Sequence, residues 1–199
     1  VEGHFLYDVG RGVDTRIVNP YTEGKPAKSV GRNYCLPHNE YDKRIVLQNV
    51  YELCEEVALK LRRLKKKARL IALSLTGEGD ISGHITFNHY FDTGKELYET
   101  CLRIIYKNAF NTEQFERGYV RQIRVWTGLL IDTAHLSLPL LPKDRKKEKI
   151  TKVVDILNDK FGHHTIRNGF LLYADKLTTV PNGFMADTYE KQKLTQKGV

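Results

Sequence analysis

The sequence lacks any long apolar run. No stretch approaches the roughly 18 consecutive apolar residues that read as a membrane-spanning helix. The first five residues, Val-Glu-Gly-His-Phe, do not begin a signal peptide, which needs a basic segment before an apolar one. We therefore expect a soluble, cytoplasmic protein with no membrane partner. Because the chain begins with Val and opens in a loop-like segment, we also expect it to be a piece of a longer protein.

Cysteine is scarce. The three cysteines, Cys35, Cys54 and Cys101, are an odd number and show no Cys-x-x-Cys spacing. This argues against a disulfide framework and suits a reducing compartment. We interpret all three as core thiols.

The patterns of the common catalytic and metal sites are missing too. The chain has no Gly-x-x-x-x-Gly-Lys-Ser/Thr loop and no Gly-x-Gly-x-x-Gly, and the nearest run, Gly10-Arg11-Gly12, precedes neither an apolar strand nor a helix. Adjacent His163 and His164 point apart on most backbones and have no cysteine or acid at ligand spacing. We expect no catalytic residue, no metal site and no cofactor within this chain.

What the sequence does have is positive charge. It holds 32 Lys and Arg against 24 Asp and Glu in 199 residues, a net charge of +8. The excess lies in residues 28–131 (17 basic, 12 acidic) and 132–199 (12 basic, 8 acidic), whereas residues 1–27 carry 3 basic and 4 acidic. A basic excess of this size indicates a polyanionic partner. The length fits one domain with an appendage.

Periodicity predicts the elements. Residues 1–27 are rich in turn formers and read as a connector without long regular elements. A helical stripe predicts a helix from Asn39, its N-cap, to about Lys66, and a Thr-x-x-Glu capping box at Thr93 begins a second helix that ends near Ala109. A third helix carries Ile150, Val153, Val154, Leu157 and Phe161 on one face and is stopped by Gly162. Alternation predicts strands at 28–36, 71–76, 81–88 and 122–126.

The order β-α-β-β-α-β predicts an α+β fold, in which two helices cover one face of a four-stranded sheet. A helical and irregular C-terminal tail follows. The other sheet face is left bare, and its residues are small, hydroxylated or basic, with no acid: Ala72, Ser74, Thr76, Ser82, His84, Thr86, Asn88, Gln122, Arg124 and Trp126.

Two basic segments accompany this face. In Lys28-Ser29-Val30-Gly31-Arg32, a glycine between hydroxyl and cationic side chains lets the backbone approach a phosphate. Residues 62–69 hold six positive charges where the first helix ends: Arg62, Arg63, Lys65, Lys66, Lys67 and Arg69. These six side chains form either a solvated helix end or a set of phosphate contacts.

Several segments resemble the little-finger domain of Y-family translesion DNA polymerases, in the UmuC-like (ImpB/MucB/SamB) branch. They are residues 28–32, Ser82-Gly83-His84-Ile85-Thr86-Phe87 and Val120-Arg121-Gln122-Ile123-Arg124-Val125. Arg11-Gly12-Val13-Asp14 resembles the end of the family's thumb. The resemblance implies three regions: 1–27 as thumb end and linker, 28–131 as little finger, and 132–199 as a tail.

The resemblance also implies that the sheet lies along the primer–template duplex and touches its phosphates. The contacts would come from Lys28, Ser29, Gly31, Arg32, His84, Thr86, Arg121 and Arg124. His84 stands where the family often has Arg, so a contact there would be weaker or pH-dependent. The family's polymerase chemistry uses palm carboxylates that precede the thumb, so this fragment would bind DNA without extending it. The full-length parent would be a Mg²⁺-dependent DNA polymerase active in lesion bypass.

A second resemblance follows the little finger. His135-Leu136-Ser137-Leu138-Pro139-Leu140 resembles the peptide with which these polymerases bind the sliding clamp, with His135 in place of the usual Gln. Three leucines on an extended peptide can serve as apolar anchors in a groove. The alternative is that the segment packs against its own domain.

Two other functions stay open. An RNA-recognition domain shares the strand order but stacks bases on aromatic side chains, of which the bare face offers Trp126. A ferredoxin-like assembly or regulatory module would share the fold but would leave the acid-free face unused.

Overall fold

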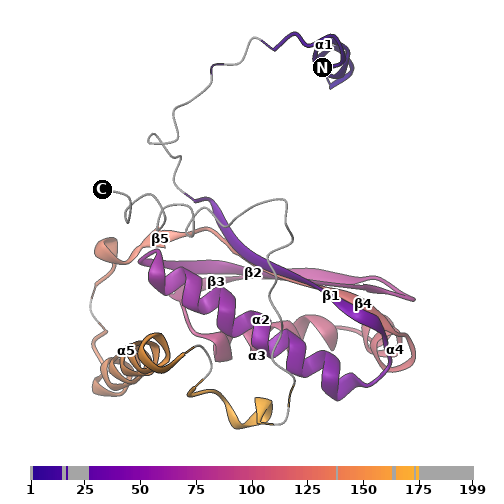
Figure 1. Cartoon of the computed structure of the whole chain (residues 1–199). Helices are drawn as coiled ribbons and strands as arrows, with labels where there is room; N and C mark the ends of the chain where they lie inside the picture. The colour runs from indigo at the N-terminus through magenta and orange to yellow at the C-terminus, as the bar shows by residue number, and fades with distance from the viewer. Residues whose placement is uncertain are drawn as a thin grey trace.

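The molecule is built on one antiparallel sheet. The structure, a computed structural model, describes residues 2–14, 17, 27–137, 139–162, 165–172 and 174. Four strands run in the spatial order β1-β4-β2-β3: β1 (Ser29–Glu40), β2 (Lys66–Gly77), β3 (Ile81–Phe91) and β4 (Val120–Gly128). Two helices, α2 (Lys43–Arg63) and α3 (Gly94–Ile105), lie on one side of this sheet (Figure 1). The predicted α+β fold and its β-α-β-β-α-β order are confirmed.

Further elements surround this unit. They are the helices α1 (Glu2–Gly10), α4 (Ala109–Arg117) and α5 (Pro142–Phe161), the short strand β5 (Ile131–Asp132) and the 3-10 turns η2 (Thr133–His135) and η3 (Gly169–Leu171). α1 falls in the segment where we expected no long regular element, and α5 begins before its predicted apolar stripe. β5 pairs with the start of β2. No helix in the described residues is long and apolar enough to span a bilayer.

The helix ends show where local signals succeed. The side chain of Thr93 accepts from the backbone N–H of Glu96 at 3.5 Å and donates to its carboxylate, so Thr93 is the predicted N-cap of α3. Asn39 was the wrong N-cap, because β1 continues to Glu40, which pairs with Val120. Asp42 caps α2 instead, accepting from the backbone N–H of Arg44 at 2.8 Å. Strand pairing with a distant segment decided this boundary.

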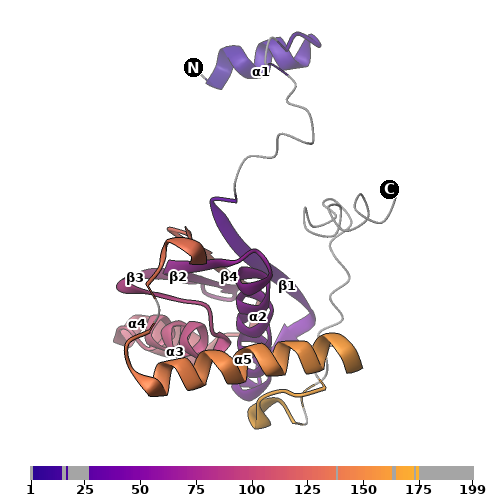
Figure 2. The ribbon, with the colours of Figure 1, turned by 90° about the vertical axis from the view of Figure 1, so that its left-hand side faces the viewer.

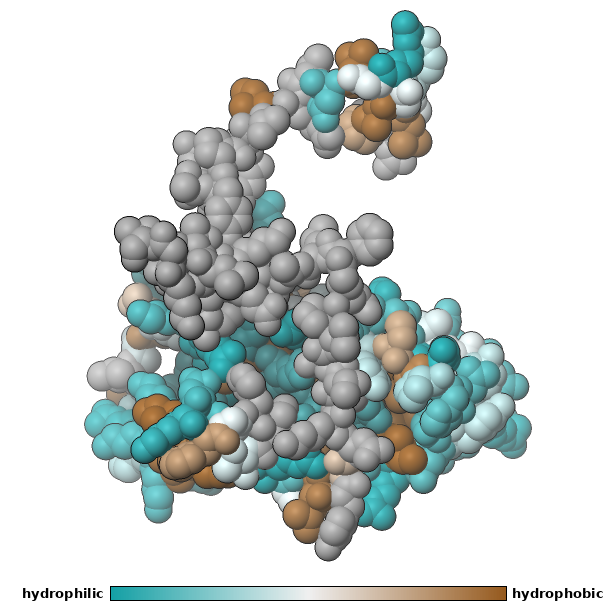
Figure 3. All heavy atoms as spheres, in the orientation of Figure 1, coloured by the Kyte–Doolittle hydropathy of each residue, from teal (hydrophilic) through white to brown (hydrophobic). Residues whose placement is uncertain are grey.

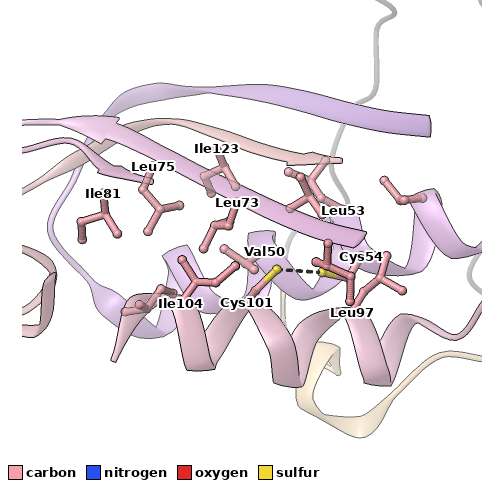
Figure 4. Close-up of a cluster of buried hydrophobic side chains, with 14 of the residues drawn as sticks. Val50, Leu53, Cys54, Leu73, Leu75, Ile81, Leu97, Cys101, Ile104 and Ile123 are labelled. Atoms are coloured by element: carbon pink, nitrogen blue, oxygen red, sulfur yellow. Dashed lines mark hydrogen bonds between the residues drawn. The ribbon is translucent and has the colours of Figure 1, made fainter. Parts of the chain in front are cut away.

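The core fills the space between the sheet and the two helices. Figure 4 shows side chains of the sheet facing those of α2 and α3, among them Leu73, Leu75, Ile123, Val50, Cys54, Leu97, Cys101 and Ile104. The Sγ atoms of Cys54 and Cys101 lie 3.8 Å apart, and both residues are fully buried. Burial raises the pKa of the Cys54 thiol, which keeps it protonated. Cys35 is exposed, so its assignment to the core was wrong.

The C-terminal helix packs where α2 ends and β2 begins. In Figure 2, α5 runs across α2 and α3 below the sheet, and its acids contact Arg62 of α2 and Lys67 of β2. None of its residues is buried, and Ile150, Val153 and Phe161 of the predicted stripe are more than half exposed. Val154 and Leu157 of the same stripe are partly buried, so the stripe predicted the helix and only part of it faces the domain.

Candidate nucleic-acid interface

The sheet face opposite the helices is arranged in rows across the four strands. The register of the ladders places these residues side by side: Ser29, Gly128, Leu70 and Thr86 in the first row, Gly31, Trp126, Ala72 and His84 in the second, Asn33, Arg124, Ser74 and Ser82 in the third, and Cys35, Gln122 and Thr76 in the fourth. We call these residues the open face. It contains no acidic side chain, as the alternation of the sequence predicted.

Hydrogen-bond donors dominate the polar part of the open face. Arg124 is exposed and lies beside Asn33 and Ser74, and His84 is exposed at the β3 edge. Gln122 donates from Nε2 to Oδ1 of Asn33 at 2.9 Å, which fixes the orientation of both amides. Because no carboxylate lies in these rows to compete for Arg124, the surface is suited to an anion with acceptor oxygens spaced along it.

Five of the eight predicted DNA contacts share this face: Ser29, Gly31, His84, Thr86 and Arg124. Lys28 precedes β1 and is exposed. Arg121 is also exposed, at an irregularity in β4 where Val120 pairs with Gly77 and Gln122 pairs with Thr76, so that Arg121 has no ladder partner on β2. Because of this extra residue in β4, the side chain of Arg121 is exposed to solvent although both of its neighbours along the strand are paired.

Arg32 lies on the other side of the sheet. It shares the inward face of β1 with Val30 and Leu36, and its Nε lies 3.2 Å from Oε2 of Glu56 on α2. The side chains of Arg32 and Glu56 are 32% and 13% exposed. This arrangement separates Arg32 from the residues with which we grouped it, because strand alternation sends neighbouring side chains to opposite faces.

The clamp-like segment connects η2 with α5. His135 ends η2 and is exposed, Leu136 and Pro139 are partly exposed, and Leu140 is 89% exposed. Ser137 is exposed, and Leu138 lies outside the described residues. Arg145 donates from Nε to the carbonyl oxygen of Pro139 at 2.7 Å, which ties the end of the segment to the first turn of α5.

The basic cluster at the end of α2 is paired with acids from α5, which neither sequence interpretation anticipated. Arg62 makes a two-pronged contact with Asp155, with Nε and Nη2 at 2.6 and 2.8 Å from its two oxygens. Arg63 pairs with Asp159, and Lys67 donates to Glu148 at 2.8 Å. The spacing of Glu148, Asp155 and Asp159 along one helix face was the available signal.

Lys67 also lies 3.7 Å from Asp92 at the end of β3. Burial opposes the charged form of Lys67, but the hydrogen bond to Glu148 and the charge of Asp92 outweigh it, so the pKa of Lys67 is raised. Burial raises the pKa of Asp92, against the attraction of Lys67 and Arg62. Lys66 is paired separately, with Asp132 at 2.7 Å.

Among the described residues, no group of three or more His, Cys, Asp or Glu side chains is placed to hold a metal ion. The fold and the open face together define an α+β domain with a helix-covered side and an acid-free sheet surface. The sequence model of the impB/mucB/samB family C-terminal domain matches residues 27–140. The chain belongs to this family, and the matched part is its C-terminal domain.

Curated relatives include DNA polymerase IV 2 of Halalkalibacterium halodurans, 25% identical over 178 residues that cover 84% of this chain and 40% of that protein. DNA polymerase IV of Clostridium perfringens (strain SM101 / Type A) is 30% identical over 125 residues, 62% of this chain and 33% of the relative. The chain thus spans less than half the length of these relatives.

Two solved structures are similar in fold. A chimera of the Y-family DNA polymerases Dbh and Dpo4 has a TM-score of 0.43 and 19% identity, over 66% of this chain and 36% of the chimera. The little finger domain of PolIV, solved in complex with the beta-clamp processivity factor, has a TM-score of 0.42 and 14% identity, over 56% of this chain and 97% of that domain.

Proposed function

We propose that this chain carries the DNA-gripping little finger of a Y-family DNA polymerase that acts in lesion bypass. The observation that carries the proposal is the open face: four paired strands present Arg124, His84 and hydroxyl side chains without one carboxylate. Membership of the family supports the polymerase context.

The open face would hold DNA through its sugar-phosphate backbone. Arg124, Arg121 and Lys28 would supply positive charge, and Ser29, Ser82 and Thr86 would donate hydrogen bonds to phosphate oxygens. Such contacts fix the position of a duplex without reading its sequence. Arg32 would act indirectly, by holding β1 against α2 through Glu56.

Nucleotide transfer belongs to another part of the parent protein. The parent would use palm carboxylates with Mg²⁺, and the residues described here would contribute only to DNA binding. The chain by itself is therefore expected to bind primer–template DNA and to leave the primer unextended.

Fluorescence anisotropy with a labelled primer–template duplex tests the open face. We expect Arg121→Ala together with Arg124→Ala to weaken binding at least tenfold, and we expect affinity to fall steeply between about 50 and 200 mM salt because phosphate contacts release counterions. Arg117→Ala is the control, because Arg117 is exposed on α4 and pairs with Glu113. The proposal would be contradicted if Arg117→Ala weakened duplex binding as much as the Arg121 and Arg124 double variant, or if the affinity did not change with salt.

Single-stranded RNA is the competing ligand. The four rows contain one aromatic side chain, that of Trp126, whereas RNA-recognition sheets stack successive bases on several. In the same titration, a preference for single-stranded RNA over the duplex would favour the RNA-binding alternative and remove the polymerase role.

The segment 135–140 is proposed as a peptide that binds the sliding clamp. What supports this is the exposure of Leu140 and the partial exposure of Leu136 on a connector between η2 and α5. Leu136→Ala and Leu138→Ala should each weaken retention on an immobilised bacterial sliding clamp, and Lys95→Ala serves as an exposed control on α3. Undiminished retention of both leucine variants would mean that the segment packs against its own domain.

A further inference from the structure

The contacts between α5 and the end of α2 have the geometry of an anion-binding site that is occupied by carboxylates. Arg62 presents two guanidinium nitrogens to the two oxygens of Asp155, and Lys67 presents its ammonium to Glu148. The side chain of Arg62 is 15% exposed and that of Lys67 is 18% exposed. A guanidinium fork and a neighbouring ammonium bind a phosphate in the same way as they bind these carboxylates.

The acids of α5 form ion pairs with cations of the domain, and Val154 and Leu157 of the same helix are partly buried. None of its residues is buried, whereas its acids pair inward: Glu148 with Lys67, Asp155 with Arg62 and Asp159 with Arg63. Lys147 adds a contact with Glu96 at 3.3 Å. Asp159 is 56% exposed, and exposed ion pairs contribute little to stability, so a phosphate in solution can compete for Arg63.

The helix also sorts its charges. Lys146, Lys149, Lys152 and Lys160 are all exposed, next to exposed Ile150, Val153 and Ile156. Hydrophilic and hydrophobic atoms accordingly alternate over α5 at the lower left of Figure 3. Glu148, Asp155 and Asp159 thus pair with the domain while four of the lysines are exposed, which is the arrangement expected if an acidic face of α5 covers a basic surface.

We propose that Arg62, Arg63 and Lys67 form a second binding site for nucleic-acid phosphates, and that the carboxylates of α5 occupy it in this structure. α5 lies on the helix-covered side of the sheet (Figure 2), whereas the open face is the other side of the sheet. The family model matches residues 27–140, so α5 lies outside the matched residues. The site becomes available to DNA when α5 undocks.

The test neutralises the three carboxylates in the full chain, as Glu148→Gln, Asp155→Asn and Asp159→Asn. We expect this triple variant to bind a fluorescein-labelled duplex at least fivefold more tightly than the wild type. A control with the same change in charge carries Asp144→Asn, Glu113→Gln and Glu116→Gln, and should gain less than twofold. Hydrogen exchange of α5 reports its undocking, and circular dichroism reports that each variant is folded.

Two further sets of substitutions show which cations are responsible for the tighter duplex binding of the neutralised variant. Adding Arg62→Gln, Arg63→Gln and Lys67→Gln to the neutralised variant should abolish it, whereas adding Lys149→Gln, Lys152→Gln and Lys160→Gln should leave most of it. Loss of the gain with the α5 lysines would overturn the proposal, as would a gain no larger than that of the control. Phosphatidylglycerol vesicles that displace the duplex from the neutralised variant, more effectively than unlabelled duplex does, would also overturn it.

The outcome is separable from the role of the open face. Arg121→Ala and Arg124→Ala in the neutralised background lower the starting affinity if the open face binds DNA. If the second site is independent, the same two substitutions leave unchanged the ratio of duplex affinities between the neutralised protein and the protein with its α5 carboxylates intact.

Discussion

At the scale of single residues, Gly31 occupies a place in the open face where a side chain has no room. A Cβ atom added there would lie 2.7 Å from Cβ of Trp126 and 3.1 Å from the carbonyl oxygen of Val125. The sequence suggested that this glycine lets a phosphate approach. The register shows a nearer reason, because Trp126 lies directly opposite Gly31 on β4.

We expect Gly31→Ala to lower the free energy of unfolding by about 1–3 kcal/mol, since the backbone of β1 or β4 must shift to admit the methyl group. Urea denaturation measures the change. Gly128→Ala is the matched control on β4, because its Cβ would meet Leu70 at an ordinary 3.7 Å. Equal losses at the two glycines would show that strand conformation, not the contact with Trp126, sets the cost.

Glu55 is a second residue whose surroundings have a measurable effect, here on the pKa of its carboxyl group. Burial raises the pKa of its carboxyl group, and the attraction of Arg62 does not fully offset this. Its partner Tyr51 has a raised phenol pKa, first through burial and then through the charge of Glu55. At pH values between the ordinary carboxyl pKa and the raised one, the folded state keeps a proton that the unfolded state has lost.

Stability should therefore fall as pH rises through that interval, because the folded state binds more protons there. Glu55→Gln removes the titration. Its free energy of unfolding relative to the wild type should increase from about pH 4 to pH 7, as measured by urea denaturation at each pH. A difference that stays constant across this range would mean that Glu55 titrates alike in both states.

At the scale of elements, the turn from α2 into β2 depends on a residue with unfavourable backbone geometry. Lys65 has φ 53°, in the left-handed region, directly after the C-cap Leu64. Its backbone N–H donates to the carbonyl of Arg62 at 3.0 Å, and its carbonyl accepts from Thr133 at 2.9 Å. The turn therefore brings the helix end, β2 and the start of η2 together.

Lys65→Gly should raise the free energy of unfolding by up to about 1 kcal/mol, because glycine adopts this conformation without strain. Thermal and urea denaturation give the change. Lys60→Gly, inside the last turns of the same helix, should instead lower stability by a similar amount. A loss at Lys65 would mean that its side chain contributes more than the strain costs.

The elements also show how far local patterns reach. The N-cap at Thr93, the termination of α5 at Gly162 and the alternation of β2 and β3 could be predicted from the sequence, since each depends on neighbours a few residues away. The start of α2 was not, because β1 extends through pairing between Glu40 and Val120. The placement of Arg32 was missed although alternation along β1 contained the signal.

At the scale of the whole molecule, α5 and η3 pack against the helices α2 and α3. Besides the α5 ion pairs, Gln48 donates to the carbonyl of Phe170 at 2.8 Å, and Leu171 is buried. Phe170 lies against the rings of Tyr51 and Tyr98. Phe170 lies 122 positions from Gln48 and 72 from Tyr98, so these contacts join distant parts of the chain.

A double-mutant cycle measures the strength of this packing. Arg62→Ala, Asp155→Ala and the double variant should give a coupling energy of about 0.5–3 kcal/mol in urea, because the pair is two-pronged and largely shielded from solvent. The pair Arg117 and Glu113, exposed at 81% and 58%, should couple by less than about 0.5 kcal/mol. A coupling as weak as that of the exposed pair would show that α5 docks by other contacts.

The sequence by itself determined the order of the elements, the acid-free face and the positive charge, because periodicity and composition are properties of neighbouring residues. Only the tertiary structure decided which cations face solvent. The sequence left Arg62, Arg63 and Lys67 open as part of a solvated helix end or as phosphate contacts, yet each meets a carboxylate from α5 some 80 to 100 positions away. Charge pairing between distant segments follows from packing, and no local pattern encodes it.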